Sequence, residues 1–337
     1  MTRLLVALTA LTAAFAAPAA TQTYTVTHRY PLGGDGGWDY LALDTAGHRL
    51  FIARQDRVMV VDPATGKVLG EIPGLDRAHG VAFAYAAGHG FATSGADSTV
   101  TMFDLKTLGV LRRTKAAVDD DGILFDPATG HIFTMNGDAG TASALDATSG
   151  ALLGAVDLGG KPEFGVSAGD GKLYINLEDQ SAVVEVDAAA MRVVRKWSIL
   201  PCESPSGLAI DRVHHRLFSG CRSGVMGVSD AAAGKLITTV PIGRGVDACR
   251  FDDATGLAFA SNGDGTITVI HEDTPDTYTV VGNVATKEGA RTMDLDPVSH
   301  RLFTVSADFG PPPQAQPGQR RRRPVVPGSF VLLELDR

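Results

Sequence analysis

The chain repeats one pattern, an apolar segment that ends in aspartate: Val-Met-Val-Val-Asp62, Val-Thr-Met-Phe-Asp104, Ala-Ser-Ala-Leu-Asp146, Val-Val-Glu-Val-Asp187 and Met-Gly-Val-Ser-Asp230. Ile-Thr-Val-Ile-His271 continues the series with a different last residue. Successive end positions lie 42, 42, 41, 43 and 41 residues apart. Short strands that recur with this period are typical of a β-propeller.

A second series has the same period. It begins with His in five repeats and with Gly in two: His48-Arg-Leu-Phe, His89-Gly-Phe-Ala, His131-Ile-Phe-Thr, Gly171-Lys-Leu-Tyr, His215-Arg-Leu-Phe, Gly256-Leu-Ala-Phe and His300-Arg-Leu-Phe. Because each copy falls at the same place in its repeat, the seven copies predict seven blades.

Each repeat is interpreted as four strands, separated by turn residues. The first would lie innermost, as in Leu-Ala-Leu-Asp44 or Leu-Ala-Ile-Asp211, and the His or Gly series would open the second. The Asp series ends the third strand. The last repeat lacks a fourth strand, and we expect segment 24–30 to supply it and so close the ring. The predicted fold class is therefore all-β, a seven-bladed β-propeller with four-stranded blades.

The N-terminus has the features of a secretory signal. Arg3 precedes an apolar run over residues 4–17, and Ala17-Pro18-Ala19 fits a cleavage site. The run is shorter than the roughly 20 residues that a membrane span needs. We therefore expect residues 1–19 to be a cleaved signal peptide, residues 20–337 to form the propeller, and the protein to be periplasmic or secreted.

The composition limits the partners. The formal net charge is −8, which argues against nucleic acid as the main partner. No later segment is long and apolar enough to span a membrane. The sequence predicts no cofactor, and we expect a monomer.

Several longer segments narrow the family: Val-Val-Asp62-Pro-Ala-Thr-Gly66, Pro205-Ser-Gly-Leu-Ala-Ile-Asp211, Asn262-Gly-Asp-Gly-Thr-Ile-Thr268 and Gly289-Ala-Arg-Thr-Met-Asp294. Through them the chain resembles the exported YncE-like, YVTN-type seven-bladed propeller repeat proteins over nearly its whole mature length. The resemblance implies the fold and export, and it implies no catalytic residue. The chain departs from the bare repeat at its cysteine pair and at an insertion in the last blade.

A binding site is expected where loops converge on the central channel. In a propeller, the loops between blades and the loops between second and third strands share one face. The candidates on that face are Trp38, Asp39, Arg77, His79, Asp121, Glu163, Glu203, Arg244, Asp247 and Arg291. One interpretation is a pocket for a small polar or anionic ligand, with arginines as bidentate donors. The other is that the carboxylates and arginines neutralise one another around a water-filled channel.

Histidine, acidic and asparagine side chains offer several possible sets of metal ligands. The periodic histidines occur once per blade on the opposite face, too far apart for one ion, and are interpreted as turn residues that bond to the backbone. His79 differs, because it starts an inner strand, where Glu163 or Asp247 would complete a site. A calcium-bound, lactonase-like centre would instead use Asn136, Glu163, Asp247 and Asn262.

The three cysteines are interpreted separately. Cys202 and Cys221 fall in loops of one blade that emerge on the same face, so the sequence predicts a disulfide between them that holds the rim of the channel. Cys249 falls within a predicted inner strand and is expected to be a buried small hydrophobe.

An insertion over residues 309–328 interrupts the last blade. It is rich in proline and contains four consecutive arginines, Arg320 to Arg323. Its composition predicts an extended, solvated loop. The alternative is a contact arm for an acidic partner, a membrane surface or nucleic acid.

The sequence favours a non-catalytic, exported scaffold that binds a small ligand or a periplasmic protein through the channel-mouth loops, because no nucleophile–base pair or metal spacing stands out. Two alternatives stay open. One is a metal-dependent, lactonase-like hydrolase with its site in the central channel. The other is a binder of nucleic acid or an anionic surface through the Arg-rich loop.

Overall fold

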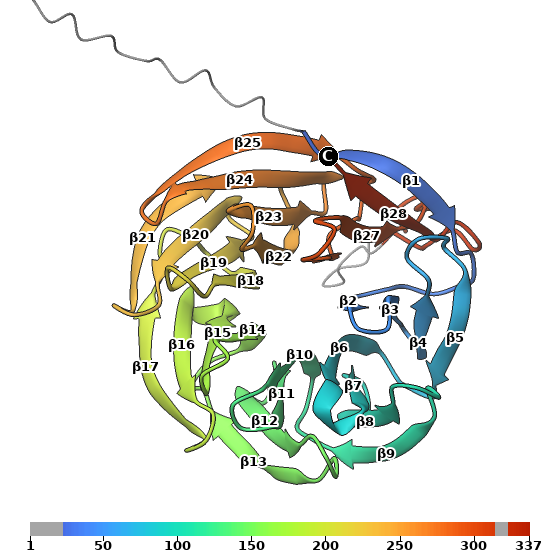
Figure 1. Cartoon of the computed structure of the whole chain (residues 1–337), viewed down its shortest axis with the longest axis horizontal. Helices are drawn as coiled ribbons and strands as arrows, with labels where there is room; N and C mark the ends of the chain where they lie inside the picture. The colour runs from blue at the N-terminus through green and yellow to red at the C-terminus, as the bar shows by residue number, and fades with distance from the viewer. Residues whose placement is uncertain (1–22, 314–322) are drawn as a thin grey trace, which may run out of the picture.

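The computed structural model describes residues 23–313 and 323–337. Seven four-stranded antiparallel sheets surround a central channel (Figure 1). This confirms the predicted seven-bladed propeller. The predicted signal peptide and Arg320 to Arg322 lie outside the described residues.

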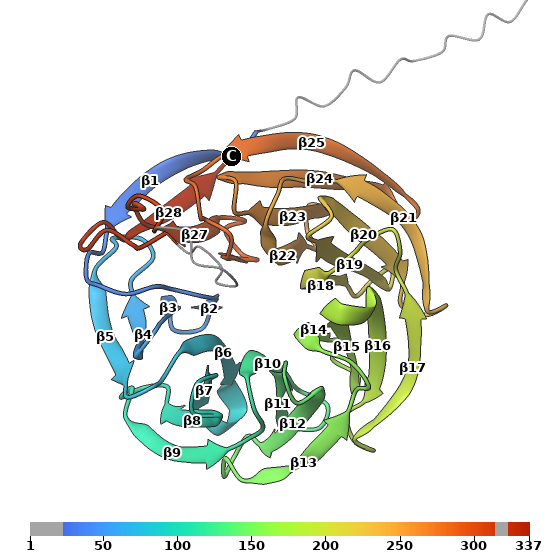
Figure 2. The same cartoon turned by 180° about the vertical axis from the view of Figure 1, so that it is seen from behind.

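The blades repeat one order of strands from the channel outward (Figures 1 and 2). The innermost strands are β2 (Leu41–Asp44), β6 (Ala78–Ala84), β10 (Asp120–Asp126), β14 (Pro162–Ser167), β18 (Pro205–Asp211), β22 (Val246–Asp252) and β26 (Met293–Leu295). The second strands are β3 (Arg49–Arg54), β7 (His89–Ser94), β11 (His131–Asn136), β15 (Lys172–Leu177), β19 (Arg216–Cys221), β23 (Leu257–Asn262) and β27 (Leu302–Ser306).

The outer half of each blade completes this order. The third strands are β4 (Arg57–Val61), β8 (Thr99–Asp104), β12 (Thr141–Asp146), β16 (Ala182–Asp187), β20 (Val225–Asp230), β24 (Thr266–Thr274) and β28 (Val331–Asp336). The outermost are β5 (Val68–Pro73), β9 (Val110–Lys115), β13 (Leu152–Asp157), β17 (Arg192–Ser198), β21 (Lys235–Pro241), β25 (Thr277–Ala285) and β1 (Thr25–Pro31). Two short 3-10 helices, η1 (Tyr85–Ala87) and η2 (Glu178–Gln180), lie in connections.

The two ends of the chain share the last blade. Strand β1 pairs antiparallel with β28, from Thr25 opposite Asp336 to Pro31 opposite Val331. The N-terminal segment therefore supplies the missing outer strand, as predicted from its alternation. The backbone hydrogen bonds between β1 and β28 thus hold the N-terminal segment in the last blade, and the chain continues from β1 into the first blade.

The hydrophobic core lies between neighbouring blades. One cluster, for example, joins Phe133 of β11 to Leu173 of β15 and Val184 of β16, which belong to the next blade. Each blade thus buries apolar side chains on both faces, whereas the outermost strands are largely exposed. This explains why the second and third strands are almost continuously apolar.

The periodic aspartates stabilise turns. Asp104 Oδ1 accepts hydrogen bonds from the backbone N–H groups of Lys106 (3.0 Å) and Thr107 (2.7 Å). Asp146 binds Ser149 in the same way at 2.7 Å. These bonds to the ionised form lower the pKa of both carboxyls. The repeat that predicts the fold is therefore a turn signal, with an acceptor placed where the chain reverses.

The periodic histidines lie in the turn between first and second strands or at the start of the second strand. His89 Nδ1 lies 3.0 Å from the carbonyl oxygen of Ala147 in the next blade, a bond to the backbone. His300 Nδ1 instead lies 2.9 Å from Asp252 Oδ2. These residues link neighbouring blades at the turn between first and second strands.

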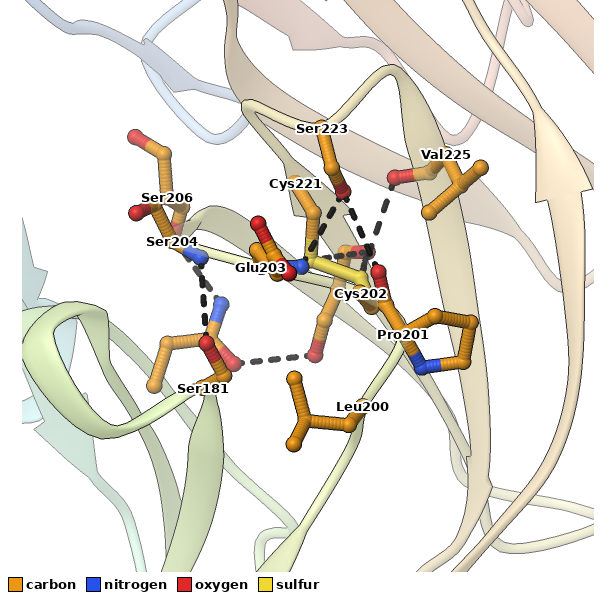
Figure 3. Close-up of a disulfide and its surroundings, with 12 residues drawn as sticks. Ser181, Leu200, Pro201, Cys202, Glu203, Ser204, Ser206, Cys221, Ser223 and Val225 are labelled. Atoms are coloured by element: carbon orange, nitrogen blue, oxygen red, sulfur yellow. Dashed lines mark hydrogen bonds between the residues drawn. A yellow bond between two sulfur atoms is a disulfide. The ribbon is translucent and has the colours of Figure 1, made fainter.

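The predicted disulfide is present in the fifth blade (Figure 3). Cys202 and Cys221 are fully buried, with their Cα atoms 5.4 Å apart. Beside them, the backbone N–H of Glu203 donates to Ser223 Oγ at 3.0 Å. The disulfide therefore joins the loop that enters β18 to the end of β19. No helix in the described ranges is long and apolar enough to cross a membrane.

The cysteine arrangement makes a prediction for thiol counts. Cys249 is free and buried, and burial raises its pKa to about 12. We therefore expect no thiol to react with a chromogenic reagent in the native protein, and one to react after denaturation without reductant. Denaturation with reductant should expose all three cysteines of the sequence. Three reactive thiols without reductant would contradict the disulfide, and one in the native state would contradict the burial of Cys249.

Candidate channel-mouth binding site

One position per blade contributes a side chain to the channel mouth. It is the second residue of the inner strand in five blades and lies two residues before that strand in the first and last blades. Its seven members, here called the channel-mouth ring, are Asp39, His79, Asp121, Glu163, Ser206, Asp247 and Arg291. In five blades the strand pairing shifts register at this point, which marks a β-bulge or irregularity. Bulges redirect a side chain away from the ordinary alternation. They explain how consecutive blades direct polar groups into the channel.

The inner strands approach one another closely just behind the ring. A Cβ on Gly122 would lie 2.8 Å from the carbonyl oxygen of Glu163, and one on Gly207 would lie 2.6 Å from the backbone nitrogen of Cys249. Such distances are shorter than real Cβ contacts, so these positions require glycine. The close approach brings ring side chains of adjacent blades within bonding distance.

His79 lies between two carboxylates of the ring. Its Nδ1 is 2.5 Å from Asp39 Oδ2 and 3.3 Å from Asp121 Oδ1, and Arg77 Nε donates to its Nε2 at 3.0 Å. Burial opposes the charge on His79, but the hydrogen bond to Asp39 and the charge of Asp121 outweigh it and raise its pKa to about 9. Arg77 also forms an ion pair with Asp119.

Ser206 connects the acids on the other side of the ring. Its Oγ lies 2.8 Å from Asp247 Oδ1 and 3.2 Å from Glu163 Oε1. A hydroxyl has a single proton, so Ser206 can donate to only one of them. Burial raises the pKa of Glu163 to about 8, helped by the charge of Asp121. The neutral Glu163 can then donate to Ser206, which in turn donates to Asp247.

Arg291 connects the last blade to its two neighbours, the sixth blade and the first. Its Nε donates to Asp247 Oδ2 at 2.5 Å, and its Nη2 lies 3.6 Å from Asp39 Oδ1. Outside the ring, Arg222 forms an ion pair with Glu178 at 2.5 Å and lies 3.5 Å from Glu163. These arginines are therefore already engaged by carboxylates.

One step of the ring is open. Among the described residues, no hydrogen bond or ion pair joins Asp121 to Glu163, although they occupy adjacent ring positions. Asp121 Oδ1 is buried and has no hydrogen-bond partner. Burial raises the pKa of Asp121 to about 7, while His79 opposes the shift. The charge of Asp121 helps to raise the pKa of Glu163, so the two carboxyls are close enough to repel each other when both are ionised.

Two aromatic rings lie just inside the mouth. Tyr40 and Phe164, from the first and fourth blades, meet with ring centroids 5.0 Å apart. Burial, together with the charges of Asp247 and Asp121, raises the pKa of Tyr40 well above its usual value. They also line a channel cavity of about 170 Å³, which Arg250 and Asp294, paired at 2.5 Å, line as well.

The remaining candidates from the sequence lie elsewhere on this face. Trp38 is buried and packs against Phe330, with centroids 5.4 Å apart. Glu203 and Arg244 are exposed in loops, and in the described structure their side chains form no ion pair. These three residues do not join the ring.

The calcium ligand set is divided between separate places. Glu163 and Asp247 meet through Ser206, whereas the buried Asn136 and Asn262 bind within their own blades. Asn136 Nδ2 donates to side-chain oxygens of its own blade at 2.9 Å, and Asn262 Nδ2 does so at 3.0 and 3.1 Å.

Sequence reasoning missed Ser206, Tyr40 and Phe164. Ser206 was overlooked because a lone serine before an apolar strand carries no chemical signal. Aligning all seven repeats at the residue before or at the start of the inner strand would have identified it. Tyr40 and Phe164 belong to different blades, and only the closed ring brings them together.

The raised pKa of Glu163 predicts a pH-dependent stability. The unfolded chain releases this proton near the ordinary value of 4.5, whereas the native state keeps it up to about 8. Native stability therefore falls as pH rises through this window. We expect Glu163→Gln to melt at a higher temperature than the wild type at about pH 8.5, with the difference vanishing near pH 5. Glu203→Gln, an exposed control, should change neither value. Equal pH profiles for wild type and Glu163→Gln would contradict the shift.

Comparison with known proteins adds the fold alone. No family model and no curated protein sequence matches the chain. Hydrazine synthase of Kuenenia stuttgartiensis has a similar structure, with a TM-score of 0.70 and 16% identity over 85% of this chain and 95% of that one. The U3-55K protein is also similar, with a TM-score of 0.75 and 9% identity over 93% of this chain and 98% of that one. At such low identity, both matches show that this chain shares a propeller fold with them.

Proposed function

We propose that the protein is an exported, non-catalytic binding protein whose channel mouth binds a small organic cation between Asp121 and Glu163. The observation that carries this proposal is the one open step of the channel-mouth ring: among the described residues, no hydrogen bond or ion pair joins Asp121, whose buried Oδ1 has no hydrogen-bond partner, to Glu163. The ring contains four carboxyl side chains but only one arginine and one histidine. This imbalance favours a positively charged ligand.

An ammonium group matches the chemistry of the open step. It offers three N–H donors, enough for Asp121 and Glu163 together. The faces of Tyr40 and Phe164 just inside the mouth would add cation–π attraction for the substituent. An anionic ligand, in contrast, would compete with the carboxylates that already hold Arg291 and Arg222.

An organic cation also fits better than a metal ion at His79. Asp39, His79 and Asp121 offer ligand atoms within 4.8 Å of one another. However, His79 keeps a proton on Nδ1, because Arg77 donates to Nε2 of the neutral ring and because the raised pKa favours the charged ring. A protonated nitrogen has no lone pair for a metal.

Export and family membership are parts of the same proposal. The disulfide is of the kind found in oxidising compartments, which supports the predicted signal peptide and a periplasmic or secreted location. The propeller fold supports the YncE-like, YVTN-type resemblance. The Arg-rich loop is less favoured as a contact arm, because Arg323 binds both carboxylate oxygens of Glu288 at 2.8 and 3.0 Å.

The proposal is tested by titration calorimetry with methylammonium, ethylammonium and n-butylammonium, each compared with the corresponding neutral alcohol. We expect the ammonium ions alone to bind. Asp121→Asn and Glu163→Gln should each weaken binding at least roughly tenfold, since each loses a charge-assisted hydrogen bond. Because both acids must ionise to bind a cation, affinity should rise from about pH 6 to 8.5, with release of protons to the buffer.

Glu203→Gln is the matched control, since it removes an exposed carboxylate from the same face. It should bind as the wild type does. Equal binding of the alcohols, or unchanged affinity in both ring variants, would refute the proposed site.

A further inference from the structure

Three side chains converge on the face opposite the channel mouth, at the border of the fifth and sixth blades. Asp211 ends β18, His214 follows in the turn to β19, and Glu272 lies on β24 of the next blade. His214 Nδ1 is 2.7 Å from Asp211 Oδ2 and 2.9 Å from Glu272 Oε1. Their ligand atoms all lie within 4.8 Å of one another.

Glu272 is a buried carboxylate in a place that the repeat makes apolar. Its backbone N–H donates to the carbonyl of Gly256, and the same bond is formed in four other blades by Leu105, Ala147, Ala188 and Ala231, all buried. The Glu272 side chain is 4% exposed, and apart from the contact of its Oε1 with His214 Nδ1, its oxygens have no hydrogen-bond partner. A buried acid without partners destabilises a fold unless something else satisfies it.

His214 is a second departure from the repeat, at the same place. In three other blades the third residue after the turn aspartate is Thr or Ser, and its hydroxyl donates to that aspartate at 2.7 Å: Thr129, Thr255 and Ser299. His214 takes this position and places Nδ1 at the same 2.7 Å from Asp211. Two residues that differ from their counterparts in the repeat, one in each of two blades, thus have their side chains at the same place.

The described residues supply too few hydrogen-bond donors for the Glu272 carboxylate. One Nδ1–H can be donated to Asp211 or to Glu272. Asp211 also accepts from the backbone N–H groups of Val213 and His214 at 2.7 and 3.2 Å, whereas Glu272 has no other donor among the described residues. The nearest cation, Arg216, is engaged elsewhere, with Asp276 at 3.0 Å and the carbonyl of Pro275 at 2.7 Å. A metal ion in place of the shared proton would satisfy both carboxylates and the nitrogen at once.

We infer that Asp211, His214 and Glu272 bind a divalent transition-metal ion, with Zn²⁺ the best match to one imidazole and two carboxylate ligands. His214 is half-exposed, and no described residue binds its Nε2, so the ring proton can sit there and leave a lone pair on Nδ1. Because His214 is half-exposed, a solvent water would supply the fourth ligand. The ion would join the turn of the fifth blade to β24 of the sixth.

The repeat itself supplies the test variants. His214→Thr and Glu272→Ala each restore the residue type that other blades use, so both should fold. Metal-stripped full-length protein is titrated with Zn²⁺ against a chromophoric chelator, and melting is followed with and without Zn²⁺. We expect the wild type to bind one Zn²⁺ at this site and to melt higher when loaded. Each variant should bind more than about 100-fold more weakly, since loss of even an outer-shell partner weakens metal sites 10–100-fold.

Glu272→Ala separates a metal site from a structural ion pair. Without metal it should melt at or above the wild-type temperature, because it removes an unpartnered buried carboxylate, yet it should lose the Zn²⁺-induced rise. Asp121→Asn, at the channel mouth, should keep that rise and its Zn²⁺ affinity, so failure here is distinguishable from failure of the ammonium site. Unchanged Zn²⁺ affinity in His214→Thr and Glu272→Ala would overturn the inference.

Discussion

The rest of the structure depends on the pairing of β1 with β28. This pairing closes the ring of blades, and side chains reinforce it: Tyr24 donates to the carbonyl of His300 at 2.8 Å, and Tyr30 donates to Glu334 Oε2 at 3.0 Å. The channel mouth also depends on this closure of the ring, because Asp39 belongs to the first blade and Arg291 to the last. Their contact exists only in the closed ring. Closure is thus what turns seven separate loop ends into one ring of interacting groups.

The architecture was predictable from the sequence because its signals are local. Each Asp-ended strand carries its own turn acceptor, as Asp104 and Asp146 show, and the period then counts the blades. The strand over residues 24–30 and the disulfide followed from topology, which the period determines. Most of the ring was also among the predicted candidates, since charged residues before an inner strand are conspicuous.

What escaped prediction depends on contacts between blades. The sequence could not show that Arg291 is bound by Asp247, or that Asp121 is left without a bond to Glu163, because side chains of adjacent blades are about 40 residues apart in the chain. For the same reason Glu272 was not noticed. Its charge is unremarkable in a list of residues and becomes informative only when its burial and its apolar counterparts are known.

In a repeat protein, a residue can be compared with the equivalent residues of the other blades. Each position has several counterparts in the same fold. A residue that differs from its counterparts and also destabilises the fold can therefore be told apart from one that only varies. Ala231 shows that the Glu272 position can be filled by a small apolar side chain, and Thr255 shows that the His214 turn forms with a hydroxyl. Other blades thus form the same strand and turn without these side chains, which makes a ligand the simplest physical reason for both.

The two histidine clusters differ in where the ring holds its proton, and this decides what each can bind. At the mouth, Arg77 donates to Nε2 of His79, so Nδ1 carries the proton that His79 shares with Asp39. The cluster there is therefore a hydrogen-bonded one, with more carboxylates than histidines. On the opposite face, Nε2 of the half-exposed His214 can carry the proton, and Nδ1 is free to coordinate. The same three residue types, one imidazole and two carboxylates, are therefore suited to an organic cation on one face of the propeller and to a metal ion on the other.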